Sequence, residues 1–194
     1  EELGSQNIIS GLLSFDDGKE NRAFTERSVN EIVRATFEMA KVKTGALMVI
    51  ERTTPLSEIE RTGIEIDGII SSQLLINIFE HNTPLHDGAV VLSGNKVVSA
   101  TCYLPLSDNM GISKDLGTRH RAAVGISEVS DSLTVVVSEE TGRVSVAENG
   151  SLRRVSDSDE LKQILSRLTE QKETGGKRFK IWKGRIRNER KIVK

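Results

Sequence analysis

The sequence has few of the residues that define several common protein classes. It contains one cysteine, Cys102, so neither an intrachain disulfide nor a cysteine-rich metal site can form. Aromatic residues are only 4% of the 194 residues, so we expect a core built from Val, Ile and Leu. The apolar run at residues 45–50 is far shorter than the roughly 20 residues with which a helix crosses a bilayer. The balance of 37% hydrophobic and 28% charged residues is typical of one globular domain.

The sequence also lacks the common nucleotide-binding and hydrolase motifs. It contains no G-x-x-x-x-G-K-[ST] phosphate loop, no G-x-G-x-x-G and no G-x-S-x-G. Its three histidines form no H-E-x-x-H zinc site. Any chemistry must therefore come from less familiar segments.

Charge is distributed unevenly along the chain. Residues 169–194 carry ten Lys and Arg against three Glu, a net +7, so the remainder carries −8 of the total −1. An acidic body argues against a domain that coats nucleic acid, and we expect no nucleic-acid partner. We interpret residues 1–24 as a lead-in, residues 25–168 as one catalytic domain and residues 169–194 as a basic tail. The tail is either solvated or in contact with a membrane surface.

The order of predicted elements indicates an α/β domain with a mixed sheet flanked by helices. Apolar residues recur at helical spacing after Thr25, which can cap that helix, and residues 45–50 read as a strand buried on both faces. A turn-rich connection over residues 51–70 leads to a second helix that opens at Ser71. Gly-Asn and Asn-Gly pairs near residues 94 and 149 predict two hairpins. Because hairpins alternate with helical crossovers, the sheet should be mixed.

The segment Asp87-Gly88-Ala89 is the first candidate for chemistry. It lies between a proline-led loop and the apolar run 89–92. Gly88 removes a side chain where a ligand would approach the backbone, and Ala89 keeps the position small. Asp-Gly is also a common turn pair, so these residues alone fit a plain turn as well.

The segment from Gly117 to Arg121, Gly-Thr-Arg-His-Arg, is the second candidate. Thr118 can cap a helix, and the backbone N–H groups at a helix start attract phosphate. Arg119, His120 and Arg121 add charge and hydrogen-bond donors. The same residues would also suit an ordinary solvated helix.

Three further segments give weaker indications of a functional role. The pair Glu139 and Glu140, after Ser138, could bind Mg²⁺ or Mn²⁺ through carboxylate oxygens or could form an acidic hairpin tip. Tyr103 and Leu104 end a strand and could receive a planar base, although packing is their default role. His86 could ligate a metal or simply lie in its loop.

Taken together, the two candidate segments resemble the paired signatures of the diadenylate cyclase (DAC) domain family. Asp-Gly-Ala and Arg-His-Arg occur here in the family's order, about thirty residues apart. The flanks match as well: residues 45–47 and 83–86, Gly117-Thr118, the pair at 122–123 and the Ser-Glu-Glu turn at 138–140. The resemblance covers about residues 25–168, and it is greatest to the membrane-anchored CdaA or DacA type.

This resemblance implies a reaction and a role for each candidate residue. Two ATP molecules would be joined into cyclic di-AMP by attack of a ribose 3′-hydroxyl on an α-phosphate. Asp87 would act as the base or orient the hydroxyl, while Arg119, Arg121 and a divalent metal, Mg²⁺ or Mn²⁺, would offset phosphate charge. The implied ATP-binding residues are Gly88, Ala89, Tyr103, Leu104, Gly117, Thr118, His120, Ser138 and Glu139, and the implied metal contacts are His86 and Glu140.

The resemblance also implies partners and a location. Because the product is nearly two-fold symmetric, two subunits should meet face to face as a homodimer, each holding one ATP. The anchored type carries transmembrane helices before this domain, and the chain does not begin with Met. We therefore expect a removed membrane anchor upstream and a position at the cytoplasmic face of the cell membrane. A module that binds ATP or cyclic di-AMP without catalysis is the alternative.

Overall fold

The computed structural model describes residues 24–109 and 116–169. All but one residue of the predicted lead-in, and all but one of the basic tail, lie outside this range. Five helices and seven strands lie within the described residues. The helices are α1 (Glu26–Lys41), α2 (Ser57–Glu60), α3 (Ser72–Phe79), α4 (Thr118–Val129) and α5 (Ser158–Ser166). The strands are β1 (Ala46–Ile50), β2 (Ile64–Ile69), β3 (Ala89–Ser93), β4 (Lys96–Cys102), β5 (Leu133–Val137), β6 (Val144–Glu148) and β7 (Ser151–Val155).

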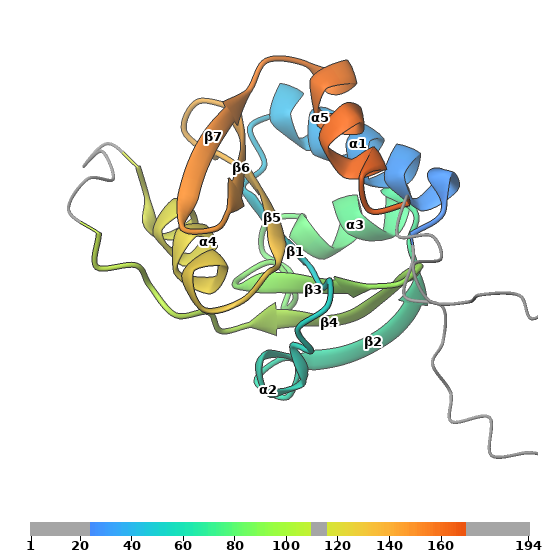
Figure 1. Cartoon of the computed structure of the whole chain (residues 1–194). Helices are drawn as coiled ribbons and strands as arrows, with labels where there is room; N and C mark the ends of the chain where they lie inside the picture. The colour runs from blue at the N-terminus through green and yellow to red at the C-terminus, as the bar shows by residue number, and fades with distance from the viewer. Residues whose placement is uncertain (1–23, 110–115, 170–194) are drawn as a thin grey trace, which may run out of the picture.

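One mixed sheet organises the domain, as the sequence predicted. The strand order is β2-β4-β3-β1-β5-β6-β7. Only β1 and β3 pair in parallel; all other neighbours are antiparallel. Both central strands are buried along their whole length except at Ser93, because helices cover both faces of the sheet. Figure 1 shows α1, α3 and α5 gathered on one side of the sheet and α4 on the other.

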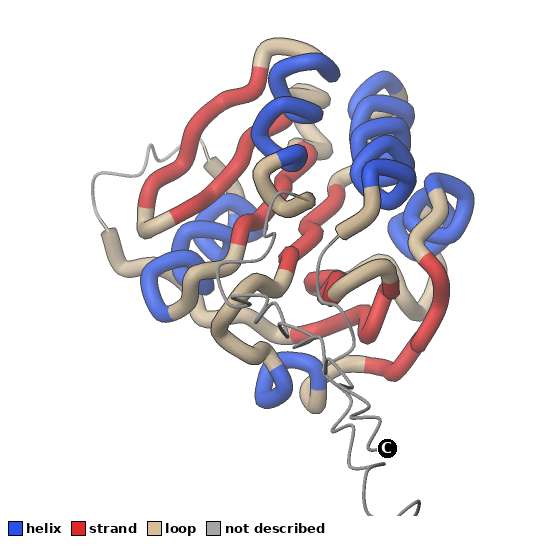
Figure 2. The backbone as a smooth tube through the Cα atoms, turned by 45° about the vertical axis from the view of Figure 1, so that its right-hand side comes forward, coloured by secondary structure: helices blue, strands red, loops and turns tan. Residues whose placement is uncertain are grey.

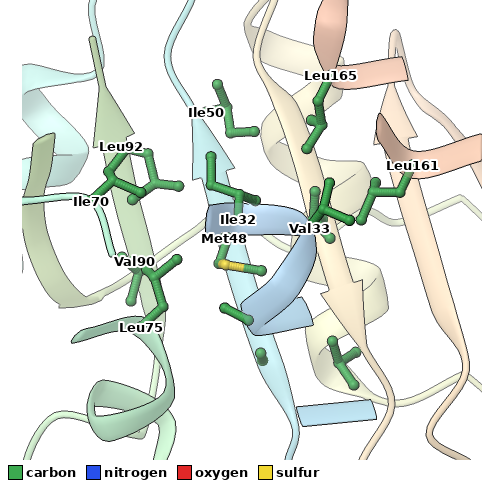
Figure 3. Packing of buried hydrophobic residues seen from close by; sticks show 14 of the residues in the cluster. Ile32, Val33, Met48, Ile50, Ile70, Leu75, Val90, Leu92, Leu161 and Leu165 are labelled. Atoms are coloured by element: carbon green, nitrogen blue, oxygen red, sulfur yellow. The ribbon is translucent and has the colours of Figure 1, made fainter. Parts of the chain in front are cut away.

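Alternating residues of the strands pack into two separate hydrophobic cores, one on each face of the sheet. Met48 and Ile50 of β1 face the helices α1, α3 and α5, where they pack with residues such as Ile32 and Leu165 (Figure 3). The intervening Leu47 and Val49 face α4 and α2. Figure 2 shows the same separation of the helices by the sheet from a second direction. The core is aliphatic, as the shortage of aromatic residues predicted.

Side chains cap three helix starts, and two of these caps confirm the starts predicted at Thr25 and Ser71. The side chain of Thr25 accepts a hydrogen bond from Ser28 N, that of Ser71 from Leu74 N, and that of Asp157 from Glu160 N. Each satisfies an N–H group that the first helical turn leaves without a partner. The predicted hairpins after residues 93 and 148 are confirmed as β3–β4 and β6–β7.

Two local predictions were wrong. The supposed turn-rich connection over residues 51–70 contains α2 and the edge strand β2. Strand β2 alternates only over Ile64 to Asp67. Most of its residues are exposed, and a bulge between Glu65 and Gly68 shifts its register with β4. In addition, Thr118 is not the cap of α4: Gly117 takes that position, without a side-chain hydrogen bond, and Thr118 is the first helical residue.

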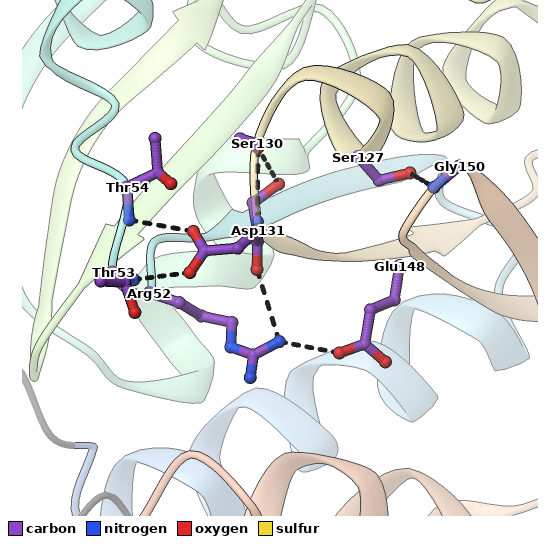
Figure 4. Close-up of polar contacts among 9 residues, drawn as sticks. Arg52, Thr53, Thr54, Ser127, Ser130, Asp131, Glu148 and Gly150 are labelled. Atoms are coloured by element: carbon purple, nitrogen blue, oxygen red, sulfur yellow. Dashed lines mark hydrogen bonds and ion pairs between the residues drawn. The ribbon is translucent and has the colours of Figure 1, made fainter.

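A polar network ties strands together at the end of the sheet where β1 stops and β5 begins. The Asp131 carboxylate accepts hydrogen bonds from the backbone N–H groups of Thr53 and Thr54 at 3.0 and 2.9 Å (Figure 4). Arg52 donates to Glu148 at 2.7 Å and to the Asp131 carbonyl at 3.4 Å. Burial works against the charged Asp131 carboxylate, but these N–H groups outweigh it and hold its pKa below the ordinary value.

We therefore expect Asp131→Ala to lower the free energy of unfolding by about 1–2 kcal/mol, because two hydrogen bonds to a charged acceptor are lost. The stabilisation by Asp131 is present above the pKa of the unfolded carboxyl and is lost as the pH falls through the lower folded pKa. Urea unfolding of the wild type and the variant at pH 7 and pH 3 measures both effects. The difference in unfolding free energy between the wild type and Asp131→Ala should be smaller at pH 3 than at pH 7. At pH 7 the stability of Asp131→Asn, which keeps one acceptor oxygen, should lie between those of the wild type and Asp131→Ala. An equal difference at the two pH values would contradict this account.

Candidate active site

The topology brings the chemistry-bearing segments to one end of the sheet. Strands β1 and β3 are parallel, so both begin there, directly after Gly45 and Gly88. The antiparallel strands β4 and β5 end there, directly before Tyr103 and Ser138. The first turn of α4 faces the same end, where Thr118 and Arg119 lie. Five elements therefore meet although their sequences are far apart.

A cleft of about 420 Å³ opens between these elements. Seven of the predicted site residues line it: Asp87, Gly88, Tyr103, Leu104, Thr118, Arg119 and Glu139. A smaller hollow of about 40 Å³ adjoins it and is lined by Gly117, Thr118, Arg119, His120, Ser138, Glu139 and Glu140, with Val137. The sequence singled out these residues one segment at a time, and the fold places them in one site.

Gly88 is required where the cleft meets β4. Its φ is +110°, a conformation that residues with a side chain rarely adopt, and a Cβ there would lie 2.8 Å from the Thr101 carbonyl carbon. A register shift between β3 and β4 lies beside it, and Thr101 takes a φ of +55°. Bulges of this kind often re-aim side chains beside active sites. The backbone geometry around Gly88 thus fixes the place of Asp87 at the cleft.

Arg119 is held in the cleft by an ion pair. Its Nη1 lies 2.6 Å from Glu139 Oε2, and its side chain is 21% exposed. Gly45 leaves the space for this pair, since a Cβ there would lie 2.8 Å from Arg119 Nη1 and 3.0 Å from Glu139 Oε2. The guanidinium is therefore oriented in advance at a position that a phosphate can reach. The N–H groups of Thr118 and Arg119 at the start of α4 lie beside it, whereas those of His120 and Arg121 donate to the Gly117 carbonyl.

His120 differs from the expectation that it adds positive charge. It is buried, with 6% of its surface exposed. Burial lowers the pKa of its imidazole, and the charge of Arg119 adds to that effect while Glu140 opposes it. Burial therefore disfavours the positively charged form of His120, whose ring lies beside the phosphate-facing turn.

Three predicted residues lie outside the lining of the cleft and the small hollow. Ala89 is fully buried and pairs with Cys102 in the sheet. Arg121 donates from Nη2 to the Ser107 carbonyl at 2.7 Å and so holds the loop that follows Leu104. The remaining residue is His86, whose Nδ1 lies 2.6 Å from the Thr83 carbonyl. Since a carbonyl only accepts, Nδ1 carries the proton and Nε2 is left as the acceptor.

The donor set for a divalent metal is incomplete in the protein alone. Among residues 24–109 and 116–169, no group of three or more His, Cys, Asp or Glu side chains could hold a metal ion. Carboxylates of Asp87, Glu139 and Glu140 do line the cleft and the small hollow. One or two carboxylates completed by substrate phosphates are a usual environment for Mg²⁺. The residues therefore fit a metal that binds together with a nucleotide.

The site also contains residues that sequence reasoning did not assign to it. Apolar or small side chains of Leu47, Cys102, Leu106 and Ala122 line the cleft, and Gly45 makes room for the Arg119–Glu139 pair. Cys102 is one of them, although its sequence context assigns it no role in a site. It is buried, and burial raises the pKa of its thiol. The segment Gly45-Ala46-Leu47 had been noticed as a flank, but nothing in its sequence indicates contact with Arg119.

These features define an α/β nucleotide-binding domain: a sheet-end cleft with an apolar wall, a helix start and an oriented guanidinium. Comparison with known proteins agrees with a nucleotide-binding domain. Residues 33–152, more than half of the chain, match the family model described as DisA bacterial checkpoint controller nucleotide-binding, the DAC family. The chain belongs to this family.

The relatives within the family are similar over most of the described domain. The chain is 56% identical over 140 residues to "Cyclic di-AMP synthase CdaA" of Bacillus subtilis, covering 72% of this chain and 51% of that protein. It is 52% identical over 187 residues to "Diadenylate cyclase" of Listeria monocytogenes, covering 95% of this chain and 66% of the relative. The chain therefore spans about half to two thirds of the length of these curated relatives.

Solved structures show the same fold. A crystal structure of a double mutant of DacA from Staphylococcus aureus superimposes with a TM-score of 0.73 at 50% identity, covering 75% of this chain and 97% of that one. A structure described as a hypothetical membrane spanning protein from Bacillus cereus has a TM-score of 0.65 at 46% identity, covering 66% and 63% of the two chains. In the described part of the present chain, no helix is long and apolar enough to cross a bilayer.

Proposed function

We propose that this domain is a diadenylate cyclase, which condenses two ATP molecules into cyclic di-AMP and two pyrophosphates. The observation that carries the proposal is the single cleft that joins Asp87, the first turn of α4 and the Tyr103–Leu104 strand end. A base, a phosphate-facing turn and an apolar wall are what this reaction needs. Relatives named as cyclases, at 52–56% identity, support the same activity.

Each ATP binds along the cleft. The adenine ring lies against Tyr103 and Leu104, where the Leu104 backbone can hydrogen-bond the edge of the base. Gly88 allows the ribose and α-phosphate to approach the backbone, and the buried Ala89 keeps the strand start small. The phosphates meet the N–H groups of Thr118 and Arg119 and the Ser138 hydroxyl.

The chemical step needs proton removal and charge compensation. Asp87 accepts the proton of the ribose 3′-hydroxyl or orients that hydroxyl toward the α-phosphorus. Arg119, set in place by Glu139 and Gly45, offsets the charge that builds on the phosphate oxygens. Arg121 acts through the loop it holds at Ser107. When a divalent metal is bound, by Glu140 with His86 as a further candidate, it supplies additional neutralisation of the phosphates.

One subunit supplies half of the reaction centre. Each cleft holds one ATP, and the hydroxyl of one nucleotide must reach the α-phosphate of the other, so two clefts face each other in a homodimer. Tyr103 and Leu106 support this arrangement, because they stand 74% and 56% exposed at the cleft. Exposed aromatic and aliphatic side chains beside a site are typical of surfaces that a partner covers.

The test is incubation of the chain with ATP and either Mg²⁺ or Mn²⁺, followed by chromatographic separation of the nucleotides. We expect cyclic di-AMP and pyrophosphate in a ratio of one to two. A non-catalytic module that binds ATP or cyclic di-AMP is the alternative. Tight ATP binding by a dimer that forms no product with either metal would favour that alternative.

The dimer makes a separate prediction for how activity depends on protein concentration. Specific activity should rise with concentration and level off as the protein dimerises, because a monomer binds ATP but cannot cyclise it. Activity and sedimentation velocity measured over the same dilution series provide the check. Constant specific activity across concentrations at which the protein sediments as a monomer would contradict the face-to-face dimer.

The cellular setting is part of the proposal. The relative described as membrane spanning supports a cyclase held at the cytoplasmic face of the cell membrane by a segment outside this domain. We propose no nucleic-acid partner. The basic tail, whose contact with a membrane surface is the alternative to a solvated segment, lies outside the described residues apart from Thr169.

Gly45→Ala should slow the cyclase about 10- to 100-fold with little loss of stability. The added methyl group displaces the flexible end of Arg119 from the position facing the phosphate, and small misplacements of this kind are costly. The initial rate of cyclic di-AMP formation measures the effect. Gly68→Ala is the control, because its Cβ crowds a similarly flexible side-chain end, Leu74 Cδ2 at 2.9 Å, away from the cleft. Equal rates for the two variants would argue against positioning by Gly45.

A further inference from the structure

A third space, a hollow of about 330 Å³, lies beside the first turn of α4 at the same end of the sheet. Strands β6 and β7 form its far wall. Its lining residues are Leu116, His120, Ser138, Glu140, Thr141, Arg143, Ser145 and Arg154. Its volume is about ten times the roughly 30 Å³ that a water molecule occupies in the liquid. There is room for a ligand the size of a pyrophosphate with some of its waters.

Two arginines in this hollow have no partner within the described residues. The side chains of Arg143 and Arg154 make no hydrogen bond or ion pair with any residue in 24–109 or 116–169. Several other arginines of the domain are paired, among them Arg52 with Glu148, Arg119 with Glu139 and Arg153 with Glu160, whereas the arginines of α1 and Arg167 form no ion pair within the described residues and line none of the three spaces. Unpaired guanidiniums that line one hollow are suited to an anion with several oxygens, which they can bind with two N–H groups each.

Strand pairing explains why both arginines line this hollow. Arg154 is opposite Ser145 in the β6–β7 ladder, so the two side chains lie on the same face, and Ser145 also lines the hollow. Arg143 precedes Ser145 by two residues and accepts a hydrogen bond at its carbonyl from Ser138 N. The neighbouring Arg153 points to the other face, where it pairs with Glu160 of α5. Alternation along the strands therefore directs Arg143 and Arg154 to the side of α4.

The hollow continues the proposed path of the ATP molecule. It shares His120, Ser138 and Glu140 with the small hollow, which in turn shares Thr118, Arg119 and Glu139 with the main cleft. Two larger spaces, joined by the small hollow between them, thus run from Tyr103 and Leu104 past the start of α4 to Arg143 and Arg154. A triphosphate whose α-phosphate lies at Thr118 and Arg119 would extend along these spaces toward the two arginines.

We propose that Arg143 and Arg154 form a subsite for the β- and γ-phosphates of ATP and for the pyrophosphate that leaves. This inference rests on the proposed cyclase function. When the 3′-oxygen bonds to the α-phosphorus, the bond from that phosphorus to the bridging oxygen breaks. The bridging oxygen leaves with the electron pair as part of pyrophosphate, while the hydroxyl proton passes to Asp87 or to water. The two guanidiniums stabilise the negative charge that collects on this leaving group.

The negative charge of Glu140 affects which form of pyrophosphate the hollow can bind. Its carboxylate lines the same hollow and would repel a bare polyphosphate. A divalent cation between the carboxylate and the phosphate oxygens removes that repulsion. The subsite should accordingly bind pyrophosphate as its magnesium complex.

The test is calorimetric titration of the full chain with magnesium pyrophosphate, ATP and AMP. The variants are Arg143→Gln, Arg154→Gln and the double substitution, and Arg153→Gln is the matched control on the other face of β7. Each single variant should weaken pyrophosphate and ATP binding about tenfold, because hydrogen bonds to a charged group are lost. AMP, which lacks the terminal phosphates, should bind all variants as it binds the wild type.

The outcomes separate this subsite from the cyclase activity. Loss of pyrophosphate and ATP affinity in the Arg143 and Arg154 variants, with AMP affinity retained, supports the subsite whether or not the chain forms cyclic di-AMP. Unchanged pyrophosphate affinity in the double variant overturns it, even if the wild type is an active cyclase. A loss of equal size in Arg153→Gln also overturns it, because the effect would then be one of overall charge.

Discussion

Asp87→Asn is expected to lower the rate of cyclic di-AMP formation by about 10²–10⁴-fold while leaving ATP binding nearly unchanged. Asn has the same size and fits the same backbone position before Gly88, but it cannot accept the proton of the 3′-hydroxyl. The effect should therefore appear in kcat and not in the dissociation constant of ATP. Single-turnover product formation and calorimetric ATP binding measure the two quantities separately.

The control for Asp87→Asn is Asp159→Asn, the same substitution at an exposed position in the first turn of α5. It removes an equal charge, but at a position distant in sequence from the residues that line the cleft. We expect its cyclase rate to stay within about twofold of the wild type. If Asp87→Asn converts ATP as fast as this control, Asp87 neither accepts the proton nor orients the hydroxyl.

Arg119→Ala is expected to reduce kcat about 10²–10³-fold, the second large effect. The substitution removes a guanidinium that Glu139 and Gly45 hold ready at the phosphates, and a donor that acts mainly in the transition state is costly to lose. Because the ground-state phosphates keep the helix N–H groups and the Ser138 hydroxyl, KM should change less than kcat. Steady-state kinetics at saturating metal resolves the two parameters.

Arg121→Ala is the informative comparison for Arg119→Ala. Arg121 donates to the Ser107 carbonyl and does not line the cleft, so it should act by holding the loop after Leu104. Its loss should raise KM for ATP more than it lowers kcat, and it should lower thermal stability. A fall in kcat as large as that of Arg119→Ala, at unchanged stability, would instead place Arg121 at the reacting phosphates.

Much of the fold could be predicted because its signals are local. The cap of α1 at Thr25, the buried run at 46–50 and the hairpin signal at Asn149-Gly150 each depend on a few consecutive residues. Strand β2 could not be predicted in this way. It is an exposed edge strand with a bulge, so it carries no continuous apolar run, and its alternation is only four residues long before Gly68 interrupts it.

The site was predictable to a lesser degree. Asp87, Gly88, Thr118 and Arg119 were singled out from short segments that resemble a known signature, and the fold places them in one cleft. Positive charge on His120 was expected from its residue type, whereas burial lowers the pKa of its imidazole, and burial is a property of the folded state. Arg143, just before β6, and Arg154, on β7, could not be predicted as site residues, because an arginine in an exposed position is usually an ordinary surface residue.

The sequence by itself determined the elements, their caps, the aliphatic core and the residue types that phosphate chemistry requires. Only the tertiary structure decided which of these residues meet. Strand order aligns the starts of β1 and β3 with the ends of β4 and β5, and this brings Gly45 against Arg119 across more than seventy residues of chain. Local pattern depends on neighbours within a few residues, whereas a site at the end of a sheet depends on long-range pairing and packing that no short segment contains.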